Sequence, residues 1–311
     1  MLVNAVFEGG GVKGICLAGA IQAAEQNGCQ FNRIAGTSSG AIVASLLAAQ
    51  YTAAEIREIV AQTNYSAFLK RARIFNTKIV GPAARVLIKK GLYSGEALEG
   101  WIKELLRKKG IHTFADLPQG KLSIIASDIT NGKILVLPDD VYKLGIDPMK
   151  LSVAKAVRMS TSIPYFFDPV ILRLNGEAAR GKKFADQFIY VVDGALLSNF
   201  PLWLFDQERP DAIDPPTIGF QMVGKAAGKP HIIRGPVSML QAMVETMLTA
   251  HDQRHISQDI IDRTIKIPSL GVSATQFEIS PEDTLRLYES GYKAGMKFFN
   301  NWRKLPNKKN A

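Results

Sequence analysis

Gly36-Thr37-Ser38-Ser39-Gly40 is the stretch that decides how this chain folds and where its chemistry lies. It follows an apolar run at 31–35 and precedes an apolar helical segment at 41–50. A serine between two glycines at a strand-to-helix turn is typical of a nucleophile elbow, a turn too tight for larger neighbours. The serine oxygen would lie at the helix N-terminus, where backbone N–H groups favour developing negative charge. Because glycine and serine are common, the pattern indicates a nucleophile only together with its flanking strand and helix.

A second glycine-rich turn comes earlier in the chain. An apolar run at 2–7 ends in Glu8-Gly9-Gly10-Gly11-Val12-Lys13-Gly14, and a helical pattern at 15–27 follows. Two strand–glycine–helix units predict a parallel sheet with both loops at its carboxyl edge. The loop fits the G-x-G-x-x-G spacing of a dinucleotide site, but no carboxylate ends the second strand, and the residues after Lys13 exclude a P-loop. Its N–H groups would instead point at an anion beside Ser38, as an oxyanion hole requires.

A nucleophilic serine needs a base, and the sequence offers two kinds. Asp193 lies in Val191-Val192-Asp193-Gly194-Ala195, directly after apolar strand residues, which places it at a sheet edge. Such an aspartate is equally typical of a turn or a helix cap, so both interpretations stay open. The histidines have no motif around them, and we expect surface or packing roles for them: His112, His231, His251 and His255. A triad of Ser38, Asp193 and either His251 or His255 remains an alternative.

Composition limits the class of protein. The chain has 311 residues, of which 47% are hydrophobic and 21% charged, as in an ordinary globular protein. The buried, reduced thiols expected for Cys16 and Cys29, and the absence of a basic-then-apolar N-terminal segment, predict a cytoplasmic protein without a signal peptide. The longest apolar run, 41–49, is too short to span a bilayer. No stretch has the composition of a linker, so we expect one domain.

The positive charge is concentrated in one region. The formal net charge is +10, and residues 61–110 hold eleven Lys or Arg against three Glu. A basic patch of this kind can meet nucleic acid or an anionic membrane, or it can be a solvated face. No aromatic-rich basic motif supports nucleic-acid binding. Basic and apolar residues are interleaved at 68–90, which predicts a cover over the Ser38 pocket that docks on anionic membranes, unless those apolar residues face the core.

The remaining elements follow from periodicity and turn residues. The pattern predicts helices within 52–110 and at 152–159, 236–257 and 282–302. Strands are predicted at 122–127, 134–137, 170–174, 184–192, 217–223 and 265–267.

Three of these segments together resemble the patatin-like phospholipase family. Residues 9–14 match its glycine-rich oxyanion loop, 36–40 its elbow and Asp193-Gly194-Ala195 its Asp-Gly-Ala motif. The likeness continues in order at 91–95, 126–133, 160–169 and 277–291, and is weakest at 176–183 and 224–235. It implies a three-layer α/β/α fold with a central, mostly parallel sheet. A single domain would span 1–311, with the main motifs within 1–201 and 202–311 completing it.

The resemblance also implies a function. A dyad, in which Ser38 attacks a fatty-acyl ester and Asp193 takes its proton, would form an acyl-enzyme that water hydrolyses. The oxyanion donors would be the N–H groups of Gly10, Gly11 and Ser39. The residues expected to support these motifs are Gly9, Gly14, Gly36, Gly40, Gly194 and Ala195. Phospholipids or other fatty-acyl esters are the expected substrates, and no metal or other cofactor is indicated. A catalytically silent lipid-binding module is the alternative of a different class.

Overall fold

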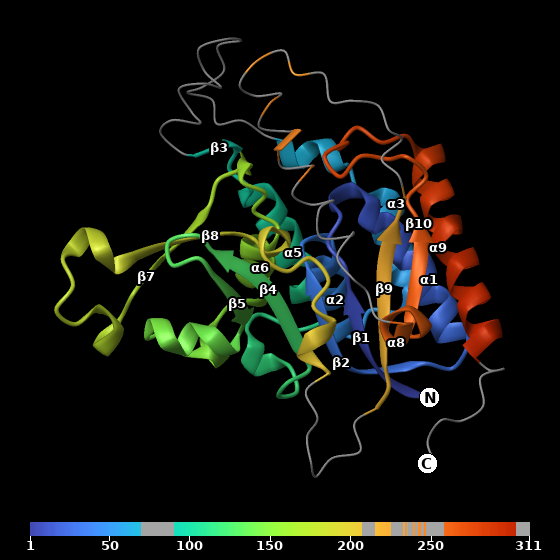
Figure 1. Ribbon diagram of the computed structural model, residues 1–311, viewed down its shortest axis with the longest axis horizontal. Helices are drawn as coiled ribbons and strands as arrows, with labels where there is room; N and C mark the ends of the chain where they lie inside the picture. The colour runs from blue at the N-terminus through green and yellow to red at the C-terminus, as the bar shows by residue number, and fades with distance from the viewer. Residues whose placement is uncertain are drawn as a thin grey trace.

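The computed structural model describes residues 1–69, 90–206, 215–224 and 258–302, together with positions 233, 235, 239, 242, 243 and 246. Within these residues the chain forms a twisted central sheet flanked by helices (Figure 1). The fold class predicted from the sequence, a mostly parallel sheet between helical layers, is confirmed.

The central sheet has eight strands among the described residues, in the order β10-β9-β1-β2-β4-β8-β7, with β5 also paired to β4. Its strands are β1 (Leu2–Phe7), β2 (Gln30–Thr37), β4 (Leu122–Asp128), β5 (Lys133–Leu137), β7 (Val170–Arg173), β8 (Phe188–Asp193), β9 (Thr217–Val223) and β10 (Thr264–Pro268). The pairs from β10 to β4 are parallel, and those of β4 with β5 and β8, and of β8 with β7, are antiparallel. A two-stranded sheet joins β3 (Gly91–Tyr93) to β6 (Tyr165–Phe167).

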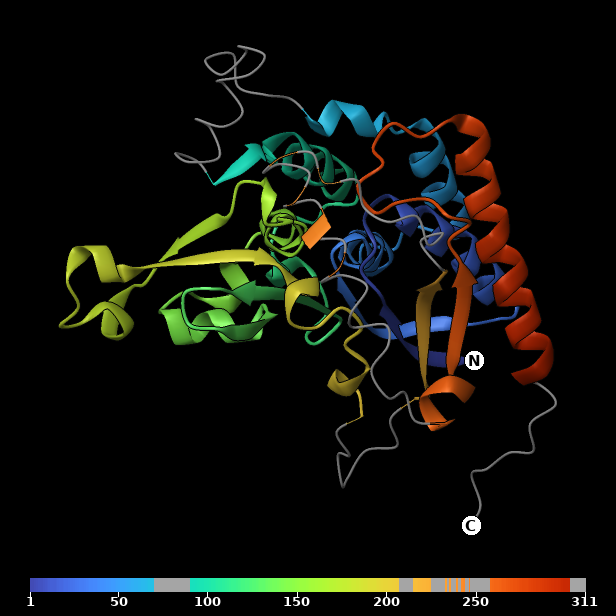
Figure 2. The ribbon, with the colours of Figure 1, turned by 45° about the horizontal axis from the view of Figure 1, so that its top comes forward.

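Helices cover both faces of the sheet. The α-helices are α1 (Ile15–Gln26), α2 (Ser39–Ala48), α3 (Ala53–Gln62), α5 (Glu96–Lys108), α6 (Val153–Ser160), α8 (Gln258–Asp262) and α9 (Pro281–Trp302). The 3₁₀ turns are η1 (Gly11–Gly14), η2 (Tyr65–Leu69), η4 (Phe114–Asp116), η5 (Asp139–Leu144), η6 (Pro148–Lys150), η7 (Gly176–Ala179), η8 (Phe184–Gln187), η9 (Gly194–Leu196) and η10 (Leu202–Leu204). Figures 1 and 2 both show α9 alongside α1 at one end of the sheet.

The apolar core divides at the sheet because successive strand residues point to opposite faces. Val3, Ala5 and Phe7 of β1 join the large core beneath α1 and α2. Val6 instead points to the other face, where it packs with Ala35 and Leu202, and Ile260 of α8 covers this smaller cluster. The helices on both sides are therefore held by apolar faces of the same strands.

Several expected elements differ from the structure. The strand predicted at 184–192 is shorter in the structure, where β8 begins at Phe188 because residues 184–187 form the turn η8. The region predicted as helical at 52–110 contains the strand β3, whose partner β6 lies far along the chain. The helix predicted at 236–257 lies mainly outside the described residues. Thr52 caps α3 as its sequence indicates, in a capping box with Glu55.

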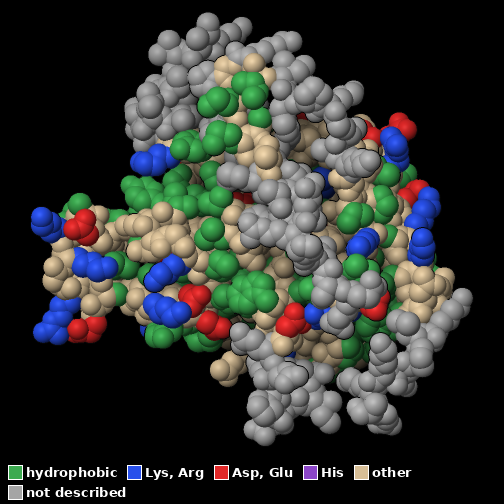
Figure 3. All heavy atoms as spheres, in the orientation of Figure 1, with side chains coloured by type: hydrophobic (Ala, Val, Ile, Leu, Met, Phe, Trp, Pro, Cys, Tyr) green, Lys and Arg blue, Asp and Glu red, His purple; other side chains and the backbone are tan. Residues whose placement is uncertain are grey.

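The helices and the surface charges of the described residues can be compared with the prediction that this protein docks on anionic membranes. Among the described residues, no helix combines the length and apolarity needed to cross a bilayer. In the basic region at 61–110, Arg107 bonds Glu104 at 2.9 Å and Lys109 bonds Glu55 at 2.8 Å, so acidic partners offset part of this charge. Figure 3 shows basic and acidic side chains mixed on the arm formed by β7 and β8, without a patch of one sign on that face.

Candidate active site

Ser38 occupies a sharp turn between a strand and a helix. β2 ends at Thr37 and α2 begins at Ser39, and Ser38 itself has φ 54° and ψ −123°. This backbone conformation is costly for a residue with a side chain and is typical of functional sites. A Cβ on Gly36 would lie 2.3 Å from the carbonyl oxygen of Gly40, so the two flanking glycines allow the strand and the helix to approach.

Strand pairing brings Ser38 and Asp193 together. Thr37 of β2 pairs with Ile125 of β4, and Asp193, the last residue of β8, pairs with Ala126 on the same strand. The two residues are 155 positions apart in sequence, yet Ser38 Oγ donates a hydrogen bond of 2.7 Å to Asp193 Oδ2. Both side chains are almost wholly buried, with 4% of Ser38 and 1% of Asp193 exposed.

The environment of Asp193 makes it a stronger base than an ordinary aspartate. Burial raises the pKa of Asp193 to about 7, although hydrogen bonds from the Ala195 N–H and from Ser38 lower it in part. The Ala195 N–H bond, 2.9 Å to Oδ1, holds the carboxylate in place while Oδ2 faces Ser38. A carboxyl group with a pKa near neutrality is suited to accept a proton and return it.

Ser160, the last residue of α6, and Ser162 just beyond it form hydrogen bonds with the backbones of Ser38 and Asp193. The sequence alone did not reveal these contacts. Ser160 Oγ accepts the Ser38 N–H at 2.9 Å and donates to the Ile125 carbonyl at 2.5 Å. The Ser162 carbonyl accepts the Asp193 N–H at 2.9 Å. Residues 160–169 carry part of the family resemblance, but nothing in their pattern indicates contact with Ser38 across 122 positions.

The glycine-rich loop lies beside Ser38, as expected from the register in which Phe7 pairs with Gly36. Gly9 N–H donates to the Asn199 carbonyl at 3.1 Å, and Gly10 N–H donates to Ser39 Oγ at 3.0 Å. The Gly10 N–H is therefore already engaged with the Ser39 hydroxyl in this structure. Ser39 N–H belongs to the first turn of α2, where N–H groups have no acceptor within the helix.

Close packing accounts for the remaining glycines of the motifs. A Cβ on Gly14 would lie 2.6 Å from the Ser39 side chain, and one on Gly194 would lie 2.2 Å from the Ile125 carbonyl oxygen. Gly14 thus sets the loop against α2, and Gly194 lets the chain turn past β4 directly after Asp193. The predicted supporting residues surround Ser38 and Asp193 and keep their backbones close.

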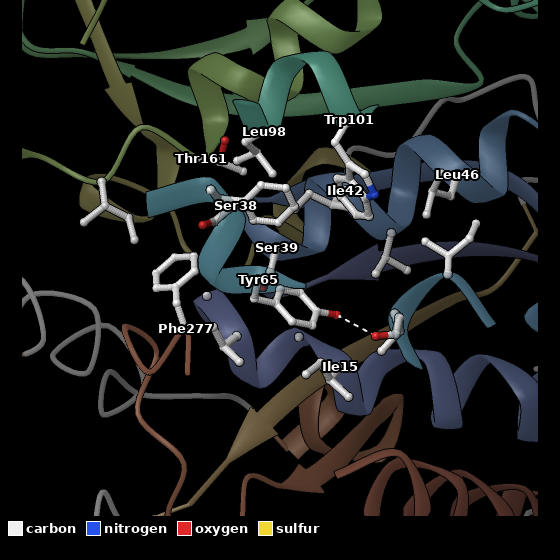
Figure 4. Close-up of a pocket in the computed structure, with 18 of the residues that line it drawn as sticks. Ile15, Ser38, Ser39, Ile42, Leu46, Tyr65, Leu98, Trp101, Thr161 and Phe277 are labelled. Atoms are coloured by element: carbon white, nitrogen blue, oxygen red, sulfur yellow. Dashed lines mark hydrogen bonds between the residues drawn. The ribbon is translucent and has the colours of Figure 1, made fainter. Parts of the chain in front are cut away.

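An apolar pocket opens at Ser38. It encloses about 730 Å³ of empty space, including the part open to solvent, and no charged side chain is found among its described lining residues. Figure 4 shows Ser38 and Thr161 at one end, Leu46 at the other, and Trp101 and Tyr65 on its walls. Ile42 and Leu46 lie one and two turns beyond Ser38 on α2, so the pocket extends about 12 Å along this helix.

Some sequence predictions fall outside this geometry. His231, His251 and His255 lie outside the described residues, as does the predicted cover at 68–90 except for Phe68, Leu69 and Lys90. His112 is exposed, and its backbone N–H bonds Asp116 at 2.8 Å, in a connector that contributes nothing to the Ser38 pocket.

The mostly parallel fold, the serine turn and the apolar pocket agree with the class that the family model gives, the lipid acyl hydrolases. The chain belongs to the patatin-like phospholipase family, whose model matches residues 5–206. The resemblance deduced from the sequence motifs is thereby confirmed.

Similar proteins extend the match beyond that range. The chain is 41% identical over 303 residues to the uncharacterized protein YqhO of Bacillus subtilis (strain 168), covering 97% of this chain and 99% of that protein. It is 25% identical over 305 residues to the uncharacterized protein R571 of Acanthamoeba polyphaga mimivirus, with 94% and 91% covered. These likenesses run nearly end to end.

Two bacterial proteins of known structure share the fold at low sequence identity. VipD from Legionella pneumophila aligns with a TM-score of 0.56 at 16% identity, covering 96% of this chain and 67% of VipD. ExoU, in its complex with SpcU from the type III secretion system of Pseudomonas aeruginosa, aligns with a TM-score of 0.53 at 16% identity. That match covers 98% of this chain and 52% of the ExoU chain, so this protein spans about half of ExoU.

Proposed function

We propose that this protein hydrolyses fatty-acyl esters of phospholipids or related lipids with Ser38 as nucleophile and Asp193 as general base. The observation that carries the proposal is the 2.7 Å hydrogen bond from Ser38 Oγ to a buried carboxylate at the mouth of an apolar pocket. A hydroxyl group is a weak nucleophile until an adjacent base takes its proton. Asp193 meets that requirement by position and by its raised pKa.

In acylation, Ser38 Oγ attacks the ester carbonyl carbon while its proton passes to Asp193 Oδ2. The carbonyl oxygen becomes an oxyanion, which accepts hydrogen bonds from the N–H groups of Gly11 and Ser39, and from Gly10 once Ser39 Oγ has moved. One such donor typically contributes about 3–4 kcal/mol to the transition state. The tetrahedral intermediate then expels the alcohol, which takes the proton from Asp193, and leaves the acyl group on Ser38.

Deacylation repeats these steps with water. Asp193 removes a proton from the water as its oxygen attacks the acyl-Ser38 carbonyl carbon. The bond to Ser38 Oγ breaks, Asp193 returns the proton to that oxygen, and the fatty acid leaves. The same carboxylate thus serves as base and acid in both halves of the cycle.

The pocket favours an acyl chain over a polar head group. Ile42, Val43 and Leu46 of α2 line it with aromatic side chains from η2 and α5, without charge among the described lining residues. Each methylene buried against such surface contributes about 0.8 kcal/mol. A phosphate would lose its hydration there without a charged partner, so a phosphorylated head group stays outside the pocket.

Covalent labelling and product analysis test the proposal together. We expect a fluorophosphonate probe to label the wild-type protein on Ser38, and a mixed lipid extract to release free fatty acids. The Ser38→Ala protein is the matched control and should give neither result. A labelled protein that releases no fatty acid from any lipid would contradict the assignment of lipid esters. Absence of labelling would favour a silent binding module.

The pKa of Asp193 predicts the pH dependence of the reaction. Because Asp193 must be ionised to act as a base and its pKa is raised to about 7, we expect kcat/KM on a soluble ester to fall below that pH. The decrease should approach about ten-fold per pH unit in acid. Initial rates between pH 5 and pH 9 measure this limb. A value of kcat/KM that stays constant between pH 5 and pH 9 would mean that the reacting carboxylate is not buried as the structure has it.

A further inference from the structure

A second cavity lies directly behind the pocket at Ser38. This outer groove runs between α3 and α5 and contains about 1160 Å³ of empty space, including the part open to solvent. Three side chains line both cavities: Ile59, Phe68 and Trp101. These three side chains form a wall between the pocket at Ser38 on one side and the outer groove on the other.

The aromatic part of this wall is thin. The ring centroids of Phe68 and Trp101 lie 5.3 Å apart at an interplanar angle of 53°, and Tyr65 packs edge-on against Phe68 at 6.2 Å. Figure 4 shows that the Trp101 side chain extends from its helix toward Ile42, into the part of the pocket between Ser38 and Leu46. One layer of side chains therefore separates the pocket from the groove.

The pocket is short for a long acyl chain. Its extent of about 12 Å from Ser38 along α2 suits a chain of medium length. A longer acyl chain has to bend back or pass the wall. Beyond the wall, Ala67, Ala97 and Leu105 offer further apolar surface, beside polar residues that face water.

We propose that Phe68 and Trp101 are specificity-determining residues that set the length of acyl chain accepted at Ser38, and that the outer groove is the path for a longer chain when this wall is opened. The inference rests on the proposed function. It adds that one aromatic pair, rather than the reacting groups, selects the substrate by chain length.

Replacing Trp101 tests the wall. Wild type and Trp101→Ala are compared on nitrophenyl esters of butyric, octanoic and palmitic acid, dispersed in the same mixed micelles. We expect the ratio of kcat/KM for palmitate to that for butyrate to rise about ten-fold or more in Trp101→Ala, since changes of one or two methylenes in an apolar pocket already produce effects of this size. Trp101→Leu, which keeps more of the buried surface, should shift the ratio in the same direction and covers a failure of the alanine variant to fold.

Two further variants distinguish an effect of the removed wall from an effect of a less rigid fold. Lys103→Ala, an exposed position on the same helix that lines neither cavity, should leave the ratio at its wild-type value. Adding Ala97→Phe to Trp101→Ala refills the groove and should reverse the gain. An unchanged ratio in both Trp101 variants, or a gain that survives Ala97→Phe, overturns the inference. Ester hydrolysis that does not depend on Ser38 would instead contradict the proposed function itself.

Discussion

Ser38→Ala and Asp193→Asn should each lower ester hydrolysis by at least about 10⁴-fold, because the nucleophile and its base act as a unit. Ser38 Oγ and Asp193 Oδ2 share one hydrogen bond of 2.7 Å, and neither can transfer the proton without the other. For the same reason the double variant should be scarcely less active than either single variant. Steady-state rates with a chromogenic ester, followed over several enzyme concentrations, measure all three proteins.

The stability of these variants provides the control for folding. In the folded protein burial raises the pKa of Asp193 to about 7, against about 3.9 in an unfolded chain, so the folded state binds the extra proton between these values. The stability that Asp193 contributes is thus present at low pH and is lost as pH rises toward 7. Asp193→Asn removes the buried charge and should raise the melting temperature relative to wild type at pH 8 but not at pH 4. Wild-type turnover by Ser38→Ala would contradict the proposed nucleophile.

The histidine alternative is tested in the same assay. His251→Ala and His255→Ala should retain activity if Asp193 takes the proton directly. Loss of activity on the scale of Ser38→Ala in either variant would favour a Ser–His–Asp triad, with Asp193 orienting the imidazole. The chain order of such a triad is the one found in ordinary α/β-hydrolases.

Gly11→Ala should produce the second large effect, a decrease in kcat of about 10²-fold or more with little change in KM. Gly11 has φ 58°, and a Cβ there would lie 2.0 Å from the carbonyl oxygen of Ala274. That neighbour is backbone and cannot swing aside, so the loop itself must shift and carry its N–H away from the oxyanion. The bond from Val12 N–H to the same Ala274 carbonyl, 3.0 Å long, should weaken with it.

Gly10→Ala is the matched comparison for the loop. Gly10 has φ −172°, which any residue adopts, and a Cβ there would meet the ends of two side chains, Met222 at 2.5 Å and Lys13 at 3.3 Å. Because the ends of these side chains can move, we expect a much smaller loss of kcat than in Gly11→Ala. A rise in KM with kcat unchanged would make the loop a substrate-binding element rather than an oxyanion hole. Equal losses of kcat in the two variants would mean that the clash with the Ala274 backbone is not what displaces the loop. Thermal unfolding of both proteins checks that the fold persists.

The sequence alone was sufficient to predict the two parallel strand–glycine–helix units at the start of the chain and the family. Apolar strands, glycine turns and helical periodicity act over a few residues, and each can be recognised without its partners. They placed Ser38 after a strand and beside the loop at 9–14, and the pairing of Phe7 with Gly36 confirms that neighbourhood. Asp193 could be located only at the end of an apolar strand, with the roles of base and turn former both open.

Tertiary structure decided what the pattern left open. Asp193 reaches Ser38 because β8 pairs antiparallel with residues 126–128 of β4, directly after the stretch 122–125 that pairs parallel with β2. No local pattern specifies this pairing. Ser160 bonds the Ser38 N–H from 122 positions away. The hydrogen bond that engages Gly10 N–H with Ser39 Oγ is likewise a matter of packing between loop and helix.

What the sequence determined by itself was the position of Ser38 in its turn, the glycine loop beside it and the strand that ends at Asp193, because steric limits and periodicity operate within a few residues. What only the tertiary structure decided was their environment. The raised pKa of Asp193 comes from burial by segments distant in sequence, and the wall formed by Phe68 and Trp101 exists only where η2 packs against α5. Desolvation and the shape of a pocket depend on every chain segment that surrounds a point in space, so they follow from the complete fold rather than from neighbouring residues.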